Sequence, residues 1–394
     1  MTKKGINNMN ITSTKKEAFK ENLQLLLQLL LLFIASRLLL VLTGCVYNYL
    51  TGDYSKTWDL LYHFDAEWYV DIIENGYQSI PRSDGQANYA FYPLYPMVVR
   101  FAKYFFPEGF TTNQVGIYVS NLCIFLASFF SVKLIRRISK QDGYFVAFLL
   151  FFAPHTMYFT MTYTEAMFIL FTVLFFYACS HKKYFIASIC ACLAAATRIV
   201  GVFLVFSLVL SMYHAQYDNH FSIRNIISFI KSIFLQPLKL LEILICPFSV
   251  FGYFYFLYHL VGDVWASAHI EVAWHHPYNN IFVALYKNLL SPGSGASSQY
   301  WSLWAILGFA LMIYLVYRGY YDYAIFGFLS LIVPFNTDVL AASRYVMGNF
   351  AIYIALNELL RNKPTARIVL MNACIPITAV LYYMWFSQNC FFVF

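Results

Sequence analysis

The chain has 394 residues, of which 60% are hydrophobic, 20% aromatic and 11% charged, and its formal net charge is +7. One soluble core cannot bury that much apolar surface, so the composition excludes a water-soluble globular protein and predicts an all-α polytopic membrane protein. Its basic residues fall in short breaks between apolar runs and form no basic face, which excludes nucleic acid as a partner.

The N-terminal part predicts a cytoplasmic tail, a first membrane helix and a long outer loop. Residues 1–22 hold five lysines and two glutamates, and residues 23–47 form an apolar run long enough to cross the bilayer. The loop at 48–110 follows, and its stretch 53–84 carries seven acidic residues against two basic ones. Because lysine and arginine favour the cytoplasmic side, we expect this loop outside. Within it, residues 93–106 suit an interfacial or half-inserted helix.

Basic breaks farther along the chain predict which connections face the cytoplasm. These breaks are 133–143, 180–184, 213–240, the region near Arg318, and 361–367. The outer side then receives the 48–110 loop, the turns near Pro154 and Arg198, the 262–299 loop and the 336–345 turn. Every unusual polar residue therefore falls on one face of the membrane.

Two apolar runs are too short to cross the bilayer alone. Residues 144–154 and 185–197 fall below the roughly 20 residues that span about 30 Å of hydrocarbon, so we expect broken or re-entrant helices that line a protein-enclosed cavity. In total we expect about ten or eleven transmembrane or re-entrant helices in a single domain, residues 23–387, with interfacial helices in the first outer loop.

The first outer loop also carries the carboxylate that we consider first for chemistry. Asp65 lies in a short acidic and aromatic cluster, between Phe64 and Trp68, in a chain with few charges. A carboxylate in that setting suits a general base, which takes a proton from a reacting hydroxyl. The alternative is structural, because Asp65 can also cap the helix that we expect to begin near Ala66.

A series of short motifs between residues 60 and 350 combines aromatic, acidic and basic residues in a fixed order. They are Phe64-Asp65-Ala66-Glu67-Trp68-Tyr69, Ile73-Glu74-Asn75-Gly76-Tyr77, Asn88-Tyr89-Ala90-Phe91-Tyr92-Pro93-Leu94-Tyr95-Pro96, Tyr163-Thr164-Glu165-Ala166-Met167-Phe168, Thr197-Arg198-Ile199-Val200-Gly201 and Ser343-Arg344-Tyr345. In this order they resemble the PIG-V-type mannosyltransferases of the GT-C class of multi-spanning glycosyltransferases. The departures are Phe64, where that family usually has Trp, and Tyr92 in place of a Phe.

The resemblance implies a GT-C fold and a sugar transfer. Its donor is a sugar on a polyprenyl phosphate, such as dolichyl-phosphate mannose, and its acceptor is a glycolipid hydroxyl, as in a GPI-anchor precursor. Transfer inverts the anomeric centre on the noncytosolic face, with Asp65 as the base and no cofactor. The membrane is the ER in a eukaryote, with a small membrane subunit as a partner. In a bacterium it is the plasma membrane, with another glycolipid or glycan as acceptor or another sugar on the donor.

Two arginines are the candidates for holding the donor phosphate. Arg198 and Arg344 suit this role because the planar guanidinium matches phosphate oxygens and stays charged beside hydrocarbon. Their alternatives are structural: a buried pair for Arg198, and Asp338 as the partner of Arg344. Glu165 suits either a sugar hydroxyl or Arg198, and we favour the pairing. For Arg37, inside the first span, we favour a buried acid or carbonyl as partner over a ligand.

The other candidate substrate-binding residues flank Asp65 in the motifs. Glu67, Trp68, Tyr69 and Tyr92 lie where a sugar needs polar and aromatic contacts. We also considered a metal held by His275-His276 or by the loop carboxylates. Adjacent histidines point apart and no third ligand stands at a useful spacing, so a metal-free site is favoured.

A transporter or flippase is the rival from a different class. Broken helices and intramembrane arginines also build transport paths, which place charge near the bilayer midplane in repeated halves. Here the charges collect at one face and no internal repeat stands out. That pattern favours an enzyme.

Overall fold

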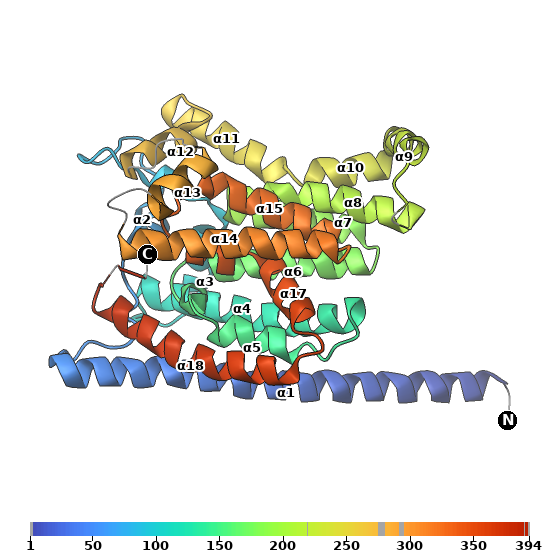
Figure 1. The fold of residues 1–394 in the computed structure, drawn as a ribbon, viewed down its shortest axis with the longest axis horizontal. Coiled ribbons are helices and arrows are strands. Elements are labelled where there is room, and N and C mark those ends of the chain that lie inside the picture. The colour runs from blue at the N-terminus through green and yellow to red at the C-terminus, as the bar shows by residue number, and fades with distance from the viewer. Residues whose placement is uncertain (1–2, 219, 275–279, 291–294, 390, 393–394) are drawn as a thin grey trace.

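The computed structural model describes residues 3–218, 220–274, 280–290, 295–389 and 391–392, and all their regular structure is helical. This confirms the predicted all-α class. A bundle of mostly apolar helices of different lengths makes up most of the molecule (Figure 1). Its members are α1 (Lys3–Thr51), α4 (Thr112–Ile138), α5 (Tyr144–Phe152), α6 (Glu165–Ser180), α7 (Tyr184–Thr197), α8 (Leu204–Tyr217), α9 (Ile223–Leu235), α10 (Pro237–Ile245), α11 (Phe248–Val261), α14 (Ala296–Tyr317), α15 (Tyr321–Phe335), α17 (Phe350–Leu359) and α18 (Pro364–Phe386).

Short helices occupy the connections between the bundle helices. They are α2 (Asp65–Asn75), η1 (Asn88–Ala90), α3 (Leu94–Lys103), η2 (Thr156–Phe159), η3 (Ile199–Phe203), α12 (Ala266–His269), η4 (Ile270–Trp274), α13 (Ile281–Leu289) and α16 (Ala342–Met347). Among them, α2, α12 and α13 gather at the end of the bundle opposite the N-terminus (Figure 1). That end carries the 48–110 loop, which the charge pattern predicts on the outer side and which we call the first outer loop.

The length and composition of the helices support a multi-pass membrane protein. In the described part, five helices are long and apolar enough to cross a bilayer, namely 19–51, 112–138, 199–217, 296–317 and 364–386. The pair α10 and α11, bent by 50°, makes a sixth if it counts as one span. Four shorter apolar helices, α6, α7, α15 and α17, lie beside them. The expected total of ten or eleven stays a prediction, because it includes such short helices.

Two predictions about short segments agree with the structure. A helix is present in the 93–106 segment as α3 (Leu94–Lys103), while its interfacial position stays a prediction, and α5 is a short helix of 9 residues. Every residue of α5 from Phe145 to Phe152 is buried, so protein rather than lipid surrounds this helix. A helix too short to span the bilayer is stable there because its neighbours enclose it.

The first helix is longer than predicted. The boundary at residue 23 is wrong as a helix start, because α1 begins at Lys3 and continues to Thr51. Residues 14–22 are mostly good helix formers such as Lys, Glu and Ala, and no proline interrupts the run. The basic N-terminal segment is therefore continuous with the first apolar span.

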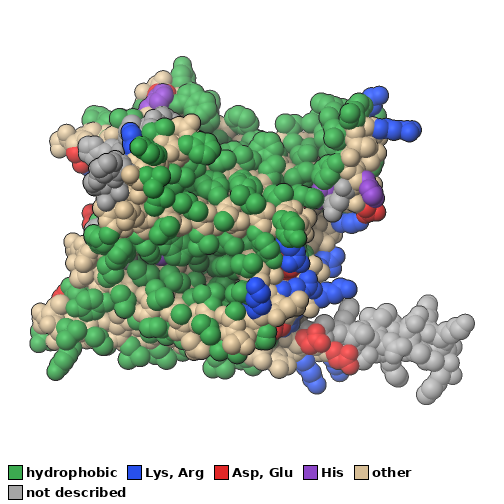
Figure 2. All heavy atoms as spheres, viewed as in Figure 1, with side chains coloured by type: hydrophobic (Ala, Val, Ile, Leu, Met, Phe, Trp, Pro, Cys, Tyr) green, Lys and Arg blue, Asp and Glu red, His purple; other side chains and the backbone are tan. Residues whose placement is uncertain are grey.

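The core of the bundle runs along α6, which packs most extensively against α4 and α7. Its outer surface is also apolar: Figure 2 shows hydrophobic side chains over most of the visible face. On α1, for example, Leu31 is 69% exposed. An apolar surface of this extent requires a bilayer as its solvent.

Charge is distributed unevenly along the bundle. Most of the visible Lys and Arg side chains gather toward the N-terminal end of the molecule (Figure 2), whereas α2, α12 and α13 lie at the other end (Figure 1). Arg136 and Arg137, for example, occupy the last turn of α4. The grouping of basic breaks at one end agrees with the pattern read from the sequence.

Candidate functional site

Four charged side chains from four separate elements meet near α2. Arg344 Nη1 of α16 donates a hydrogen bond to Asp65 Oδ2 of α2 at 2.6 Å. Arg344 Nε also donates to Glu165 Oε1, at the start of α6. Arg198 Nη1, between α7 and η3, donates to the same oxygen of Glu165. We call Asp65, Arg344, Glu165 and Arg198 the charged cluster.

The charged cluster is buried at one end and open at the other. The side chain of Glu165 is 2% exposed and that of Arg344 12%, whereas Arg198 is 20% and Asp65 29% exposed. A buried ion costs several kcal/mol unless it is paired, and here two acids face two arginines. Glu165 is therefore the floor of the cluster, and Asp65 lies at its rim.

Aromatic rings surround the two guanidinium groups. The Arg344 guanidinium lies 4.6 Å from the ring centre of Tyr163 and 5.2 Å from that of Tyr158. The Arg198 guanidinium lies 5.6 Å from the ring of Tyr345. Such cation–π contacts stabilise a charge where water is scarce. The rings therefore fix both arginines without neutralising them.

Asp65 is placed by an unusual turn into α2. Phe64 has φ 55° and ψ −121°, a strained conformation for a residue other than glycine, and Asp65 is the first helical residue. No side chain caps this helix, so the capping role considered for Asp65 is wrong. The Phe64 ring packs against Trp385 of α18 at 5.3 Å between centroids. That contact anchors the turn on α18. The Asp65 carboxylate accepts its hydrogen bond from Arg344.

Arg198 is placed by the break between α7 and η3. The backbone of Arg198 is extended, and η3 then folds back against α7. A Cβ on Gly201 would lie 2.4 Å from backbone atoms of Ala194 and Ala195. Only glycine allows this approach, so Gly201 determines where α7 ends and where the guanidinium points.

The predicted pairings of the charged residues are partly confirmed. Glu165 pairs Arg198, as expected, and also Arg344. The pairing of Arg344 with Asp338 is wrong, because Arg344 binds Asp65 and Glu165. Asp338 instead accepts a hydrogen bond from Asn288 at 3.0 Å.

Arg37 has a different partner from the one expected. Its Nη1 donates to the Thr160 hydroxyl at 2.6 Å, and its guanidinium lies 4.7 Å from the ring of Phe33. The predicted acid or carbonyl partner is therefore wrong. A hydroxyl and a ring in the protein interior contact this cation, while its buried Nε has no hydrogen-bond partner among the described residues.

The aromatic candidates Trp68 and Tyr92 pack against rings of the first outer loop and of α11. Trp68 stacks on Phe91 with 5.9 Å between ring centroids, and the guanidinium of Arg82 covers the Trp68 ring at 3.6 Å. Tyr92 packs against Tyr253 of α11 at 4.7 Å. Trp68 and Tyr92 are 7% exposed. Their expected contact with a sugar stays a prediction.

Tyr69 and Glu67 differ in their relation to the charged cluster. The Tyr69 hydroxyl donates to Thr164 Oγ1 at 3.4 Å, and Arg198 Nη1 reaches the same oxygen at 3.4 Å. Burial raises the pKa of the Tyr69 phenol, which keeps it protonated as a donor. Glu67 is exposed and shares no hydrogen bond or ion pair with the cluster. The structure therefore brings Tyr69, but not Glu67, to the site.

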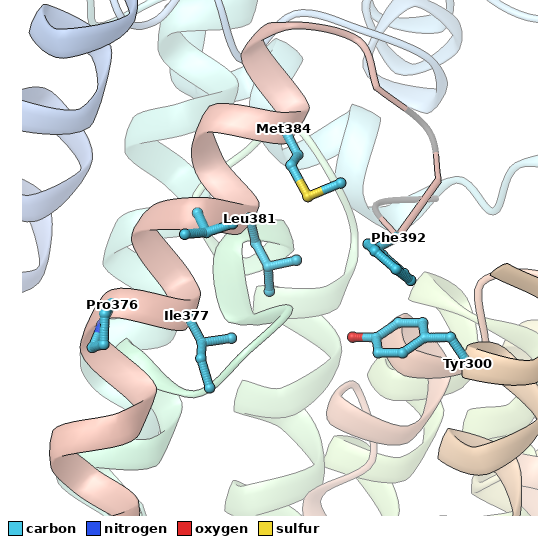
Figure 3. A pocket seen from close by; sticks show the side chains of 7 residues that line it. Tyr300, Pro376, Ile377, Leu381, Met384 and Phe392 are labelled. Atoms are coloured by element: carbon cyan, nitrogen blue, oxygen red, sulfur yellow. The ribbon is translucent and has the colours of Figure 1, made fainter. Parts of the chain in front are cut away.

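An apolar pocket of about 390 Å³ opens between α14 and α18 (Figure 3). Tyr300, whose hydroxyl hydrogen-bonds His155 Nε2 at 2.6 Å, lies on its α14 side. Leu381 of the opposite wall packs in one hydrophobic cluster with Tyr158, the ring beside Arg344. The lining residues are Tyr300, Pro376, Ile377, Val380, Leu381, Met384 and Phe392. An apolar space of this kind suits a hydrocarbon chain.

Within the described residues, no group of three or more His, Cys, Asp or Glu side chains has the arrangement of a metal site. The His275-His276 pair considered from the sequence lies outside the described residues. No family model, curated protein or solved structure matches the chain. The GT-C fold and the family resemblance therefore stay predictions.

Proposed function

We propose that this protein is a membrane glycosyltransferase that moves a sugar, mannose in the first instance, from a polyprenyl- or dolichyl-phosphate donor onto a hydroxyl group. The charged cluster is the observation that carries this proposal. It joins a partly exposed carboxylate, Asp65, to two arginines that are anchored on one buried acid, Glu165. These are the groups that a phosphate-linked sugar needs for transfer.

The arginines supply the phosphate site. Arg198 and Arg344 share one oxygen of Glu165, so these three residues together hold one net positive charge. That charge is offset by Asp65 only at the rim. A guanidinium binds phosphate oxygens in its own plane, and a phosphate held in this way departs without a general acid.

Asp65 supplies the base. An acceptor oxygen forms the new bond to the anomeric carbon on the face opposite the phosphate, and the bond from that carbon to the phosphate oxygen breaks. The hydroxyl proton passes to the Asp65 carboxylate, and the polyprenyl phosphate leaves with the bonding electrons. The configuration at the anomeric carbon is therefore inverted.

The location of the charged cluster supports a reaction at the membrane's outer surface. The cluster belongs to the α2 end of the molecule, whereas most of the visible basic side chains lie toward the N-terminal end (Figures 1 and 2). Basic residues remain in the cytoplasm, so the cluster faces the noncytosolic side. The apolar pocket between α14 and α18 suits the prenyl chain of the donor.

The motifs that resemble PIG-V-type enzymes support the family assignment. Asp65, Glu165, Arg198 and Arg344 come from four of these motifs, and they meet in the charged cluster although up to 279 residues separate them. The acceptor on this proposal is a glycolipid such as a GPI-anchor precursor, or a bacterial glycan. The membrane is the ER in a eukaryote and the plasma membrane in a bacterium.

Two measurements test this function. Purified protein in liposomes is given a panel of polyprenyl-phosphate sugars with membrane lipid extract as the acceptor, and transfer of the labelled sugar is measured. In parallel, the glycolipids of a deletion strain are identified by mass, where the unmodified acceptor should accumulate. Transfer from the mannose donor supports the proposal. No transfer from any donor, together with an unchanged glycolipid profile, contradicts it and favours the transporter.

A further inference from the structure

A second apolar pocket, of about 420 Å³, lies between the first outer loop and the bundle. Its walls come from α2 and α3 of the loop, from the end of α7 and from α11, and α3 packs against both α2 and α7. We call it the α3 pocket, and its lining residues differ from those of the pocket between α14 and α18. Six residues mark its walls: Ile72, Pro96, Met97, Ala196, Gly252 and Phe256.

The α3 pocket has room for a hydrocarbon chain. A Cβ on either of two lining glycines, Gly76 after α2 and Gly252 in α11, would meet no described atom within 4 Å. The pocket volume falls within the roughly 300–1,000 Å³ of small-molecule sites. Phe101 on α3 is 65% exposed and Phe251 on α11 is 64% exposed. The helices of the pocket therefore present apolar side chains that need hydrocarbon as their solvent.

Three of the four polar side chains on the lining have partners within the protein. The hydroxyl groups of Tyr77, Ser249 and Tyr253 each donate to a backbone carbonyl oxygen, at 2.7, 2.6 and 2.8 Å. The fourth, Arg100, is exposed and has no hydrogen bond or ion pair with any described residue. A cation without a described partner therefore stands beside apolar walls.

Arg100 differs in this respect from the basic residues near it. It lies in the last turn of α3, whereas most of the visible Lys and Arg side chains gather toward the N-terminal end of the molecule (Figure 2). Lys103, in the same turn, lies 3.7 Å from Glu74. Arg82, earlier in the loop, lies 3.7 Å from Asp71. The charge of Arg100 is therefore available to a ligand, whereas the other two bases already face a carboxylate.

An apolar pocket with a cation on its lining matches a ligand that joins a hydrocarbon chain to an anion. A guanidinium binds phosphate oxygens, and basic pockets between membrane helices bind anionic lipid headgroups. A glycerophospholipid carries both parts in one molecule, whereas free phosphate has no chain to fill the pocket. The surrounding bilayer supplies such a lipid directly to an apolar surface.

We propose that the α3 pocket binds an anionic glycerophospholipid of the outer leaflet, with an acyl chain between α3 and α11 and its phosphate on Arg100. Ile72 of the pocket follows Asp65 by seven residues of α2, or about 10 Å along the helix axis. The lipid therefore lies beside the charged cluster and outside the reacting centre. It contacts α2 and α7, the two helices that position Asp65 and Arg198, and its binding is independent of sugar transfer.

Thermal unfolding of the full chain in detergent measures this binding. The probe is dioctanoyl phosphatidylglycerol, because a ligand that binds only the folded protein raises Tm as its concentration rises. Dioctanoylglycerol has the same chains without the phosphate, and glycerophosphoglycerol has the phosphate without the chains. We expect the Kd of phosphatidylglycerol to be about tenfold lower than that of either part. Equal Kd values for phosphatidylglycerol and dioctanoylglycerol overturn the proposal.

Arg100→Gln tests the phosphate contact. This exposed substitution should raise the Kd of phosphatidylglycerol about tenfold and leave that of dioctanoylglycerol within about twofold. Arg136→Gln is the matched control, because Arg136 is also an exposed arginine in the last turn of its helix, at the other end of the bundle. It should bind phosphatidylglycerol as wild type does. An unchanged Kd in Arg100→Gln overturns the proposal.

Gly252→Phe tests the chain contact. Its ring should occupy the space that the acyl chain needs, so the Kd of phosphatidylglycerol should rise about tenfold. Gly252→Ala also replaces the glycine but leaves most of the pocket open, so its Kd should stay within about twofold of wild type. A Gly252→Phe protein that binds phosphatidylglycerol as wild type does contradicts occupancy of the α3 pocket.

A last arm separates a bound bilayer lipid from a sugar acceptor. Protein loaded with phosphatidylglycerol is incubated with polyprenyl-phosphate mannose, and the lipid is then recovered and identified by mass. We expect its mass to be unchanged, whereas a lipid carrying a sugar would assign the pocket to the acceptor and overturn the proposal. If no donor gives transfer, the glycosyltransferase assignment fails, and the Tm measurements on wild type and Arg100→Gln still decide the α3 pocket.

Discussion

Glu165 is the residue that holds the two arginines together. Its buried Oε1 accepts from both guanidinium groups, so Glu165→Gln leaves two cations with too little negative charge. Removing one partner of a buried ion pair costs about 3–5 kcal/mol. We therefore expect the free energy of unfolding of Glu165→Gln to fall by about that amount. Thermal or denaturant unfolding in detergent measures it.

Glu358 offers a matched control. Its buried carboxylate lies 3.4 Å from Arg318 and 3.6 Å from Arg361, far from the charged cluster. Glu358→Gln should also lose stability, but its affinity for a prenyl phosphodiester such as farnesyl methyl phosphate should be unchanged. A Glu165→Gln protein with wild-type stability and wild-type phosphodiester affinity contradicts the account.

Arg198 tests the phosphate site. Arg198→Lys keeps the positive charge but loses the planar guanidinium, whose Nη1 donates hydrogen bonds to both Glu165 and Thr164. We expect the KM for the polyprenyl-phosphate donor to rise about tenfold with a smaller change in kcat. Arg318→Lys, at the other end of the bundle, is the control and should leave KM unchanged. An unchanged KM in Arg198→Lys assigns Arg198 to structure alone.

All four members of the charged cluster could be named from the sequence. Charge is rare in this chain, so an acid or arginine among apolar residues stands out, as Glu165 and Arg198 do. Their partners were harder to predict. Asp338 is near Arg344 in sequence, but the fold brings Asp65 closer, from 279 residues away.

At the scale of elements, the break after α7 offers a sharp test. Gly201→Ala places a Cβ 2.4 Å from the backbone of α7, so η3 must move and Arg198 moves with it. We expect Gly201→Ala to fold but to bind the donor about tenfold more weakly or worse. The measurement is its affinity for farnesyl methyl phosphate. Gly252→Ala in α11 is the control, because a Cβ there has no atom within 4 Å. Equal donor affinity in both variants would contradict the claim that the break between α7 and η3 positions Arg198 for the donor.

Short helices were predictable from length, and so was the enclosure of α5 by protein. The runs at 144–154 and 185–197 indicated broken or re-entrant helices because each is shorter than a span; α5 and α7 are indeed short, while the cavity they were expected to line stays a prediction. The start of α1 at Lys3 was not predicted, since polar residues of good helix propensity look like a tail until the apolar run after them is known to continue the helix.

At the scale of the whole molecule, the account requires the two ends of the bundle to lie on opposite sides of the membrane. In a background with Cys45 replaced by Ser, Asp84→Cys in the outer loop should react with a membrane-impermeant maleimide in intact cells. Lys140→Cys, just after α4, should react only after permeabilisation. The reverse pattern contradicts a noncytosolic site.

The number of spans is the part of the architecture that sequence leaves open. Helices such as α6 and α17 are apolar but shorter than a bilayer is thick, and protein encloses much of their surface. Hydropathy reports burial and does not distinguish burial in protein from burial in lipid. For that reason the all-helical membrane class was predictable, whereas the crossings were not.

The most direct measurement is sugar transfer by Asp65→Asn in liposomes, with labelled polyprenyl-phosphate mannose and lipid extract as acceptor. Arg344 still binds Glu165 in this variant, so the fold and donor binding should persist. Transfer should fall about 10²- to 10⁴-fold, because the proton acceptor is gone. Asp84→Asn, an exposed acid of the same loop, should transfer as wild type does. Wild-type transfer by Asp65→Asn would contradict the account.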